Sequence, residues 1–69
     1  MKADMDKLRG KIVENKMTHE ELALKIGINP STLSRKLKSE GLDFTVGEMH
    51  KIANALNLTD NEAIQIFLQ

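Results

Sequence analysis

The sequence between residues 18 and 38 constrains the fold of this chain more than any other feature, because it reads as two short helices that meet at a sharp corner. Gly27 stands where a left-handed residue is expected to end the first helix, since glycine adopts that conformation without a Cβ penalty. Asn29 is suited to cap the second helix, with Pro30 at its first position. Ala23 is small enough for the second helix to pass close over the first. Residues 18–38 are therefore predicted to form a helix-turn-helix, a motif that indicates DNA binding.

Helix starts are marked four times by one pattern: an apolar residue, a capping residue, two further residues, a residue that can complete the cap, and another mostly apolar residue. In three of these sites a threonine is followed three positions later by a glutamate, which is the spacing of a capping box. An opening helix is expected over residues 4–15, where apolar side chains recur at helical spacing. The sequence therefore predicts five helices and no strand, an all-α fold. The four marked sites are residues 17–22, 28–33, 44–49 and 58–63.

The length of the chain, 69 residues without cysteine, supports one small domain over residues 1–69 with a single apolar core. The lack of cysteine excludes a disulfide framework. No run approaches the roughly 18 apolar residues of a membrane span, and the first six residues are too charged for a signal peptide. We therefore expect a cytoplasmic protein without a membrane partner.

Apolar residues at helical spacing supply the expected core. Their burial is expected to stabilise a domain of this size by only a few kcal/mol net. The predicted core residues are Leu8, Ile12, Leu22, Ala23, Ile26, Leu33, Leu37, Phe44, Met49, Ile52, Ala53, Leu56, Ile64 and Phe67.

The last helix provides the candidate protein interface. An inward stripe of residues 63, 64, 67 and 68 would leave Ile66 roughly 160° from Ile64 and therefore exposed. A contact to another protein chain would then involve Ile66, Leu68 and Leu42, although a single exposed isoleucine is also ordinary in a monomer. The substitution Ile66→Asp is expected to weaken association without unfolding the monomer.

One face of the second motif helix, residues 29–38, is free to contact DNA. Leu33 and Leu37 are four residues apart, so both are expected to point inward. Ser31 and Arg35 lie two residues from Leu33 on either side, roughly 200° round the helix, and are expected to point outward. In a major groove about 12 Å wide, Arg35 is the best candidate for a bidentate contact to guanine. A solvated side chain or a phosphate contact is the alternative interpretation of Arg35.

Phosphate contacts are expected where helices begin and where lysines extend from the second motif helix. Helix N-termini attract phosphate, although a threonine at such a position is equally well explained as a helix cap. Lysines add mobile positive charge. The candidates are Thr18 and His19 at one helix start, Thr45 at another, and Lys36 and Lys38.

Net charge is the feature that argues against DNA binding, because it is formally zero and DNA-binding domains are usually basic. The distribution is uneven. Residues 25–40 hold four positive and one negative residue, residues 41–69 hold one and four, and residues 1–24 hold five of each. The positive excess therefore lies on the motif, but a single copy is expected to bind DNA weakly and to need dimerisation or a partner.

Three segments in register, Glu21-Leu22-Ala23, Ile26-Gly27-Ile28 and Ser31-Thr32-Leu33-Ser34-Arg35, resemble the phage-repressor family of helix-turn-helix domains, the Cro/repressor or XRE type. The resemblance extends over residues 18–57. It implies a compact five-helix bundle of the lambda-repressor-like type, whose third helix reads operator DNA, commonly as a dimer. By family position it places base contacts at Pro30, Ser31 and Arg35, and phosphate contacts at His19, Thr32 and the Phe44-Thr45 amides.

The sequence favours a sequence-specific DNA-binding transcriptional regulator, phage or prophage encoded, with Pro30, Ser31, Ser34 and Arg35 near the bases of double-stranded operator DNA. A regulator that acts by binding another phage repressor, as a heteromer with weak or no DNA binding alone, is the rival hypothesis. An antitoxin-like autoregulator is a third, although no toxin-binding tail is expected. A homodimer is compatible with each of these hypotheses.

No catalytic site, cofactor or metal is expected. His19 and His50 lie in separate predicted helices without metal-ligand spacing. The sequence contains no glycine-rich phosphate loop and no nucleophile elbow. The chain is therefore not expected to be an enzyme.

Overall fold

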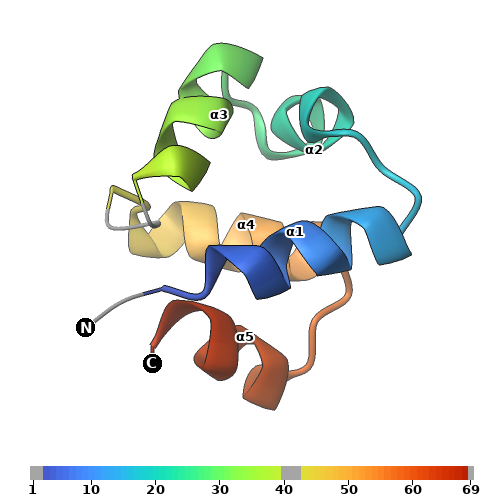
Figure 1. The fold of residues 1–69 in the computed structure, drawn as a ribbon, viewed down its shortest axis with the longest axis vertical. Helices are drawn as coiled ribbons and strands as arrows, with labels where there is room; N and C mark the ends of the chain where they lie inside the picture. Colours follow the sequence, from blue (N-terminus) through green and yellow to red (C-terminus); the bar gives the residue numbers. More distant parts are fainter. Residues whose placement is uncertain (1–2, 40–42, 69) are drawn as a thin grey trace.

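Five helices make up the part of the chain that the computed structural model describes, residues 3–39 and 43–68. They are α1 (Met5–Glu14), α2 (His19–Ile26), α3 (Pro30–Lys38), α4 (Val46–Ala55) and α5 (Asp60–Phe67). Figure 1 shows α2 and α3 on one side of the molecule and α5 on the other, with α1 and α4 between them. Helix α2 packs against both α3 and α4, and α5 packs against α1 and α4. The predicted all-α, five-helix fold is confirmed. None of these helices is long and apolar enough to span a membrane.

Helix starts follow the predicted caps. Thr18, Thr45 and Thr59 each accept a hydrogen bond from the backbone N–H of the glutamate three positions later, and that glutamate accepts one from the threonine N–H. Asn29 caps α3 through a 2.8 Å bond from the N–H of Ser31, with a proline in the first turn. Each cap satisfies backbone donors that a helix leaves unpaired, so these local signals set the helix boundaries.

Three of the connections between helices have the same construction. Lys16, Gly27 and Asn57 all take a left-handed conformation, with φ of 57°, 77° and 53°. In each case the N–H of the left-handed residue and that of its successor bond back to carbonyls of the helix that ends there, as in a Schellman motif. The successor is apolar and is followed by the cap of the next helix. One short connector therefore turns the chain after α1, α2 and α4.

The core contains most of the predicted residues, with one error in α5. Ile66 is completely buried, whereas Ile64 is 50% exposed. The expectation that Ile66 is exposed is therefore wrong, and Ile66→Asp would place a charge in the core rather than at an interface. Met49 and Ala53 are only half-buried, and Met5 joins the core. The buried residues are Met5, Leu8, Ile12, Leu22, Ala23, Ile26, Leu33, Leu37, Phe44, Ile52, Leu56, Ile66 and Phe67.

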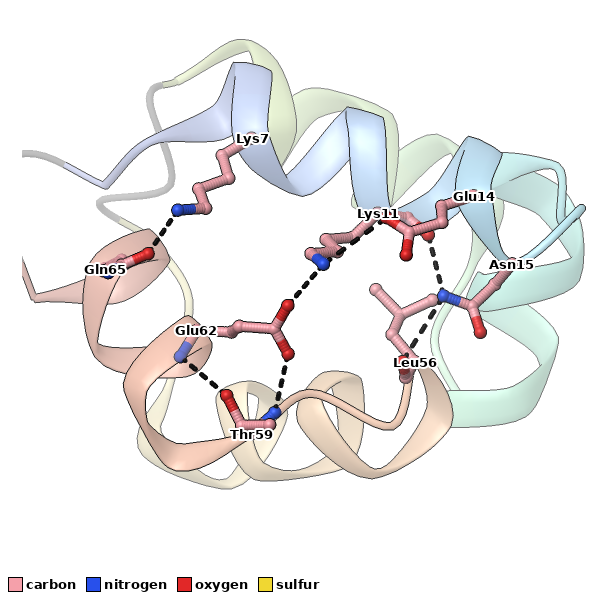
Figure 2. Close-up of polar contacts among 8 residues, drawn as sticks. All are labelled: Lys7, Lys11, Glu14, Asn15, Leu56, Thr59, Glu62 and Gln65. Atoms are coloured by element: carbon pink, nitrogen blue, oxygen red, sulfur yellow. Dashed lines mark hydrogen bonds and ion pairs between the residues drawn. The ribbon is translucent and has the colours of Figure 1, made fainter.

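Polar contacts between α1 and α5 agree with the observed rotation of α5. Figure 2 shows Lys11 paired with Glu62, and Lys7 bonded to Gln65. The Ile66 carbonyl accepts a 2.6 Å hydrogen bond from the N–H of Asp4. Residues 62, 65 and 66 lie on one face of a helix, and all three contacts are made to α1 or its cap, so that face is turned toward α1. The rotation carries Ile66 into the core and moves Ile64 outward.

Candidate nucleic-acid interface

The outer face of α3 carries the residues predicted to contact bases. Leu33 and Leu37 are buried against the rest of the molecule, as their four-residue spacing predicts. Ser31 and Arg35 are exposed on the other side of the helix. Arg9 of α1 donates a 3.2 Å hydrogen bond to the Leu37 carbonyl, which anchors the C-terminal end of α3. Helix α3 is therefore held along its inner face and at its end, while its outer face is open.

A groove runs between the outer face of α3 and the start of α2. Both sides of the groove carry residues predicted to bind DNA, so the fold brings two separate sequence segments onto one surface. Arg35 and Lys38 contribute positive charge to the lining of this groove, and Glu20 contributes negative charge. Glu20 was not predicted, and its only sequence signal is its place beside His19 in the first turn of α2. The lining residues are Thr18, His19, Glu20, Pro30, Ser31, Ser34, Arg35 and Lys38.

The other two threonines predicted to contact phosphate do not line this groove. Thr45 is exposed at the start of α4, where its hydroxyl accepts a 3.1 Å bond from the N–H of Glu48. The hydroxyl proton of a threonine that caps in this way is still available to donate. Thr32 is half-buried on α3. Figure 1 shows that α4, which Thr45 caps, begins on the side of the molecule where α3 ends.

Lys36 does not extend toward solvent as the sequence led us to expect. Its ammonium lies 2.6 Å and 2.9 Å from the two carboxylate oxygens of Glu48, and its side chain is only 12% exposed. The hydrogen bond from Lys36, together with one from the Thr45 backbone, holds the pKa of Glu48 below its usual value. Lys36 is therefore an internal link between α3 and α4 and not a mobile surface charge.

A sequence model of the Cro/C1-type HTH DNA-binding domain matches residues 7–65, most of the chain. The chain belongs to this family. The Cro/C1-type assignment makes the protein a DNA-binding regulator, and it agrees with the open face of α3. Families of this kind are typically not enzymes. No curated protein and no solved structure gives a significant match.

The three residues predicted to form a protein interface of this Cro/C1-type domain differ in their exposure. Ile66 is buried, Leu42 lies outside the described residues, and Leu68 is 54% exposed. Leu68 lines an apolar groove between α4 and α5. This groove was not predicted from the sequence, because the rotation of α5 that we expected was wrong. This α4–α5 groove is lined by Val46, Met49, His50, Ala53, Asn54, Leu58, Asp60, Ala63, Ile64, Phe67 and Leu68.

Proposed function

We propose that this Cro/C1-type protein is a sequence-specific transcriptional regulator that places α3 in the major groove of operator DNA. The observation that carries the proposal is the groove in which the start of α2 and the outer face of α3 meet. Arg35 is exposed there and is suited to a bidentate contact with guanine. Pro30, Ser31 and Ser34 are the other proposed base contacts. Pro30 has no N–H to donate but can contact a thymine methyl.

The proposed phosphate contacts are residues around this groove and at the start of α4. Thr18 and His19 lie at the N-terminus of α2, where the helix dipole and free amides favour an anion. Thr45 has the same position on α4. Lys38 and Thr32 on α3 complete the set, whereas Lys36 is left out because its ammonium is paired with Glu48.

We also propose that the regulator acts as a homodimer, with the α4–α5 groove as its interface. Two observations support a second copy as the occupant. Among the described residues, Arg35 and Lys38 are the only lysine or arginine side chains that line the protein groove between α2 and α3. One copy therefore makes few phosphate contacts. The α4–α5 groove includes Val46, next to Thr45 at the proposed DNA face. A second copy there would add its own DNA-binding surface.

The resemblance to phage repressors favours a phage or prophage origin, which the neighbouring genes would test.

The decisive experiment is Arg35→Ala, measured by fluorescence anisotropy on a duplex selected from a randomised pool by the unmodified protein. We expect the loss of one bidentate base contact to weaken binding by about 1–3 kcal/mol, which is roughly 5- to 150-fold. Lys25→Ala is the matched control because it removes one positive charge from a different surface, beside Lys51 and Asn54. It should change affinity little, and both variants should keep the circular dichroism spectrum of the unmodified protein.

The rival function is that of a modulator that binds another repressor. It is favoured by the low positive charge of the protein groove between α2 and α3. Under that hypothesis no sequence would be enriched from the pool, and regulation in cells would survive Arg35→Ala. Enrichment of one sequence together with loss of regulation in Arg35→Ala would contradict the rival. Enrichment of no sequence by the protein alone would contradict the proposal.

A further inference from the structure

The pair formed by Lys36 on α3 and Glu48 on α4 is the most enclosed ion pair among the described residues. The two side chains are 12% and 16% exposed. The Lys36 ammonium also lies 5.8 Å from the centroid of the Phe44 ring, within the range of a cation–π contact. Phe44 is buried and meets Phe67 edge to face, with centroids 6.0 Å apart. The ammonium is thus held between a carboxylate and a ring that is itself fixed in the core.

Glu48 has a second contact that connects this pair to the start of α4. Its Oε1 atom accepts a 2.9 Å hydrogen bond from the Thr45 N–H, and its own N–H donates to the Thr45 hydroxyl at 3.1 Å. One carboxylate therefore caps α4 and also binds α3. Lys36 directly follows Arg35, the residue proposed to read guanine. A chain of contacts thus connects the helix that carries Arg35 to the helix end that carries Thr45.

We infer that Lys36 is a positioning residue for DNA recognition. Through Glu48 it fixes the orientation of α3 relative to the N-terminus of α4, so that Arg35 meets a base edge when Thr45 meets the backbone. This inference rests on the proposed function. A base contact discriminates only when its donors are held close to the productive geometry, whereas phosphate contacts tolerate small displacements. Loss of the pair should therefore lower specificity more than it lowers general affinity for DNA.

Glu48→Gln tests the inference through the sign of its effect. Glutamine keeps the capping box of α4 but removes the charge that holds Lys36. If electrostatics alone mattered, removal of a negative charge near DNA and release of a lysine would tighten binding. If positioning matters, affinity for the selected duplex should fall about tenfold, the order expected when one bidentate contact is misaligned. Affinity for a scrambled duplex of equal length should stay the same or rise, so the ratio of specific to non-specific affinity falls.

Glu21→Gln is the matched control. Glu21 holds the same position in the capping box of α2, also at a proposed phosphate site, but no lysine or arginine among the described residues pairs with it. It should tighten binding to both duplexes alike and leave their ratio unchanged. Lys36→Met, which keeps the buried aliphatic stem, should lower the ratio as Glu48→Gln does. The double variant of Lys36 and Glu48 should be no worse than either single one, since both remove the same link.

The outcomes separate this inference from the proposed function. An unmodified protein that shows no preference for any duplex would contradict the proposed function. A preference that survives in Glu48→Gln and Lys36→Met, with both variants folded by circular dichroism, would overturn the positioning role alone. Equal weakening on both duplexes in Lys36→Met, with tighter binding in Glu48→Gln, would show that Lys36 contacts phosphate directly and would also overturn it.

Discussion

Single residues with left-handed backbone conformations end three helices of this protein, and they do so at different energetic cost. Gly27 has φ of 77°, and a Cβ added there would meet no atom within 4 Å. Gly27→Ala would therefore be strained by its backbone alone, and not by a steric clash. We expect Gly27→Ala to lower the free energy of unfolding by about 1 kcal/mol, because a left-handed conformation costs L-residues roughly 1–2 kcal/mol. Urea denaturation would measure this loss.

Gly10→Ala is the control for this prediction, because it makes the same substitution with the opposite expected sign. Gly10 lies inside α1, is exposed, and also has open space around an added Cβ. Alanine should raise the free energy of unfolding there by roughly 0.5–1 kcal/mol, since it favours the helix over the unfolded chain. A destabilisation by both substitutions would contradict the assignment of the loss at Gly27 to its φ, because only Gly27 is left-handed.

Residues that act within a few positions of the chain could be predicted, and residues that act across the fold could not. The caps at Thr18 and Thr45 were predicted because each is completed by a glutamate three positions away. Gly27 was predicted from its residue type. The role of Lys36 was missed because its partner lies twelve positions away on another helix. A lysine on an amphipathic helix gives no sign of such a partner.

At the scale of the helices, α5 shows where the hydrophobic pattern is ambiguous. A stripe that contains Ala63 and Phe67 can be completed either by residues 64 and 68 or by residue 66. Helical periodicity accepts both stripes, but Ile66 is buried whereas residues 64 and 68 are exposed. The choice is made by α1, which pairs with the face of α5 that carries Glu62. The existence and start of α5 could thus be predicted from the sequence, whereas its rotation depends on a helix that is far away in the sequence.

The same contacts should make the stability of the α1–α5 pair depend on pH. Hydrogen bonds from Lys11 and from the Thr59 backbone lower the pKa of Glu62 from 4.5 to about 2. A carboxylate with a depressed folded pKa stabilises the fold fully above its unfolded pKa, and this contribution is lost as pH falls from 4.5 toward 2. Glu62→Gln keeps the capping box and removes the charge. The unmodified protein should therefore exceed Glu62→Gln in Tm at about pH 6, and the difference should shrink at about pH 3.

Lys11→Met provides the partner control for this prediction. The bond to Glu62 raises the pKa of Lys11, so the lysine stays charged throughout this acidic range and only the carboxylate titrates. The difference in Tm between the unmodified protein and Lys11→Met should shrink over the same pH range. A difference that is constant from about pH 6 to about pH 3 for both variants would show that this ion pair does not contribute to the stability of the folded chain.

At the scale of the whole molecule, the distribution of charge on the surface matters more than the net charge of zero. The positive excess of residues 25–40 is divided by the fold. Lys36 is paired internally, Lys25 lies beside Lys51 on another surface, and Arg35 and Lys38 reach the groove between α2 and α3. The sequence could locate the basic segment but not this division, because the division depends on how α3 packs against its neighbours. Two cations per copy give little non-specific affinity, which favours a dimer.

The α4–α5 groove leads to the last prediction. Ile64 is 50% exposed in this groove, whereas Leu24 is 71% exposed on α2, outside it. Both residues are exposed enough for Ile64→Asp and Leu24→Asp to leave the monomer folded. If two copies meet through this groove, Ile64→Asp should abolish association, because a carboxylate would be desolvated in each half of a symmetric interface. Leu24→Asp should associate as the unmodified protein does. Sedimentation velocity over a range of concentrations, with and without the selected duplex, measures both.

DNA makes this experiment sensitive to a weak dimer, because two half-sites on one duplex raise the effective concentration of the second copy. The unmodified protein and Leu24→Asp should therefore sediment as two copies per duplex, even at concentrations where the free protein is monomeric. Ile64→Asp should sediment as one copy per duplex, and its affinity should fall accordingly. One copy per duplex for the unmodified protein would contradict the homodimer. Two copies for Ile64→Asp, bound as cooperatively as the unmodified protein, would move the interface to another surface, because a charge in the α4–α5 groove would desolvate a carboxylate in each copy.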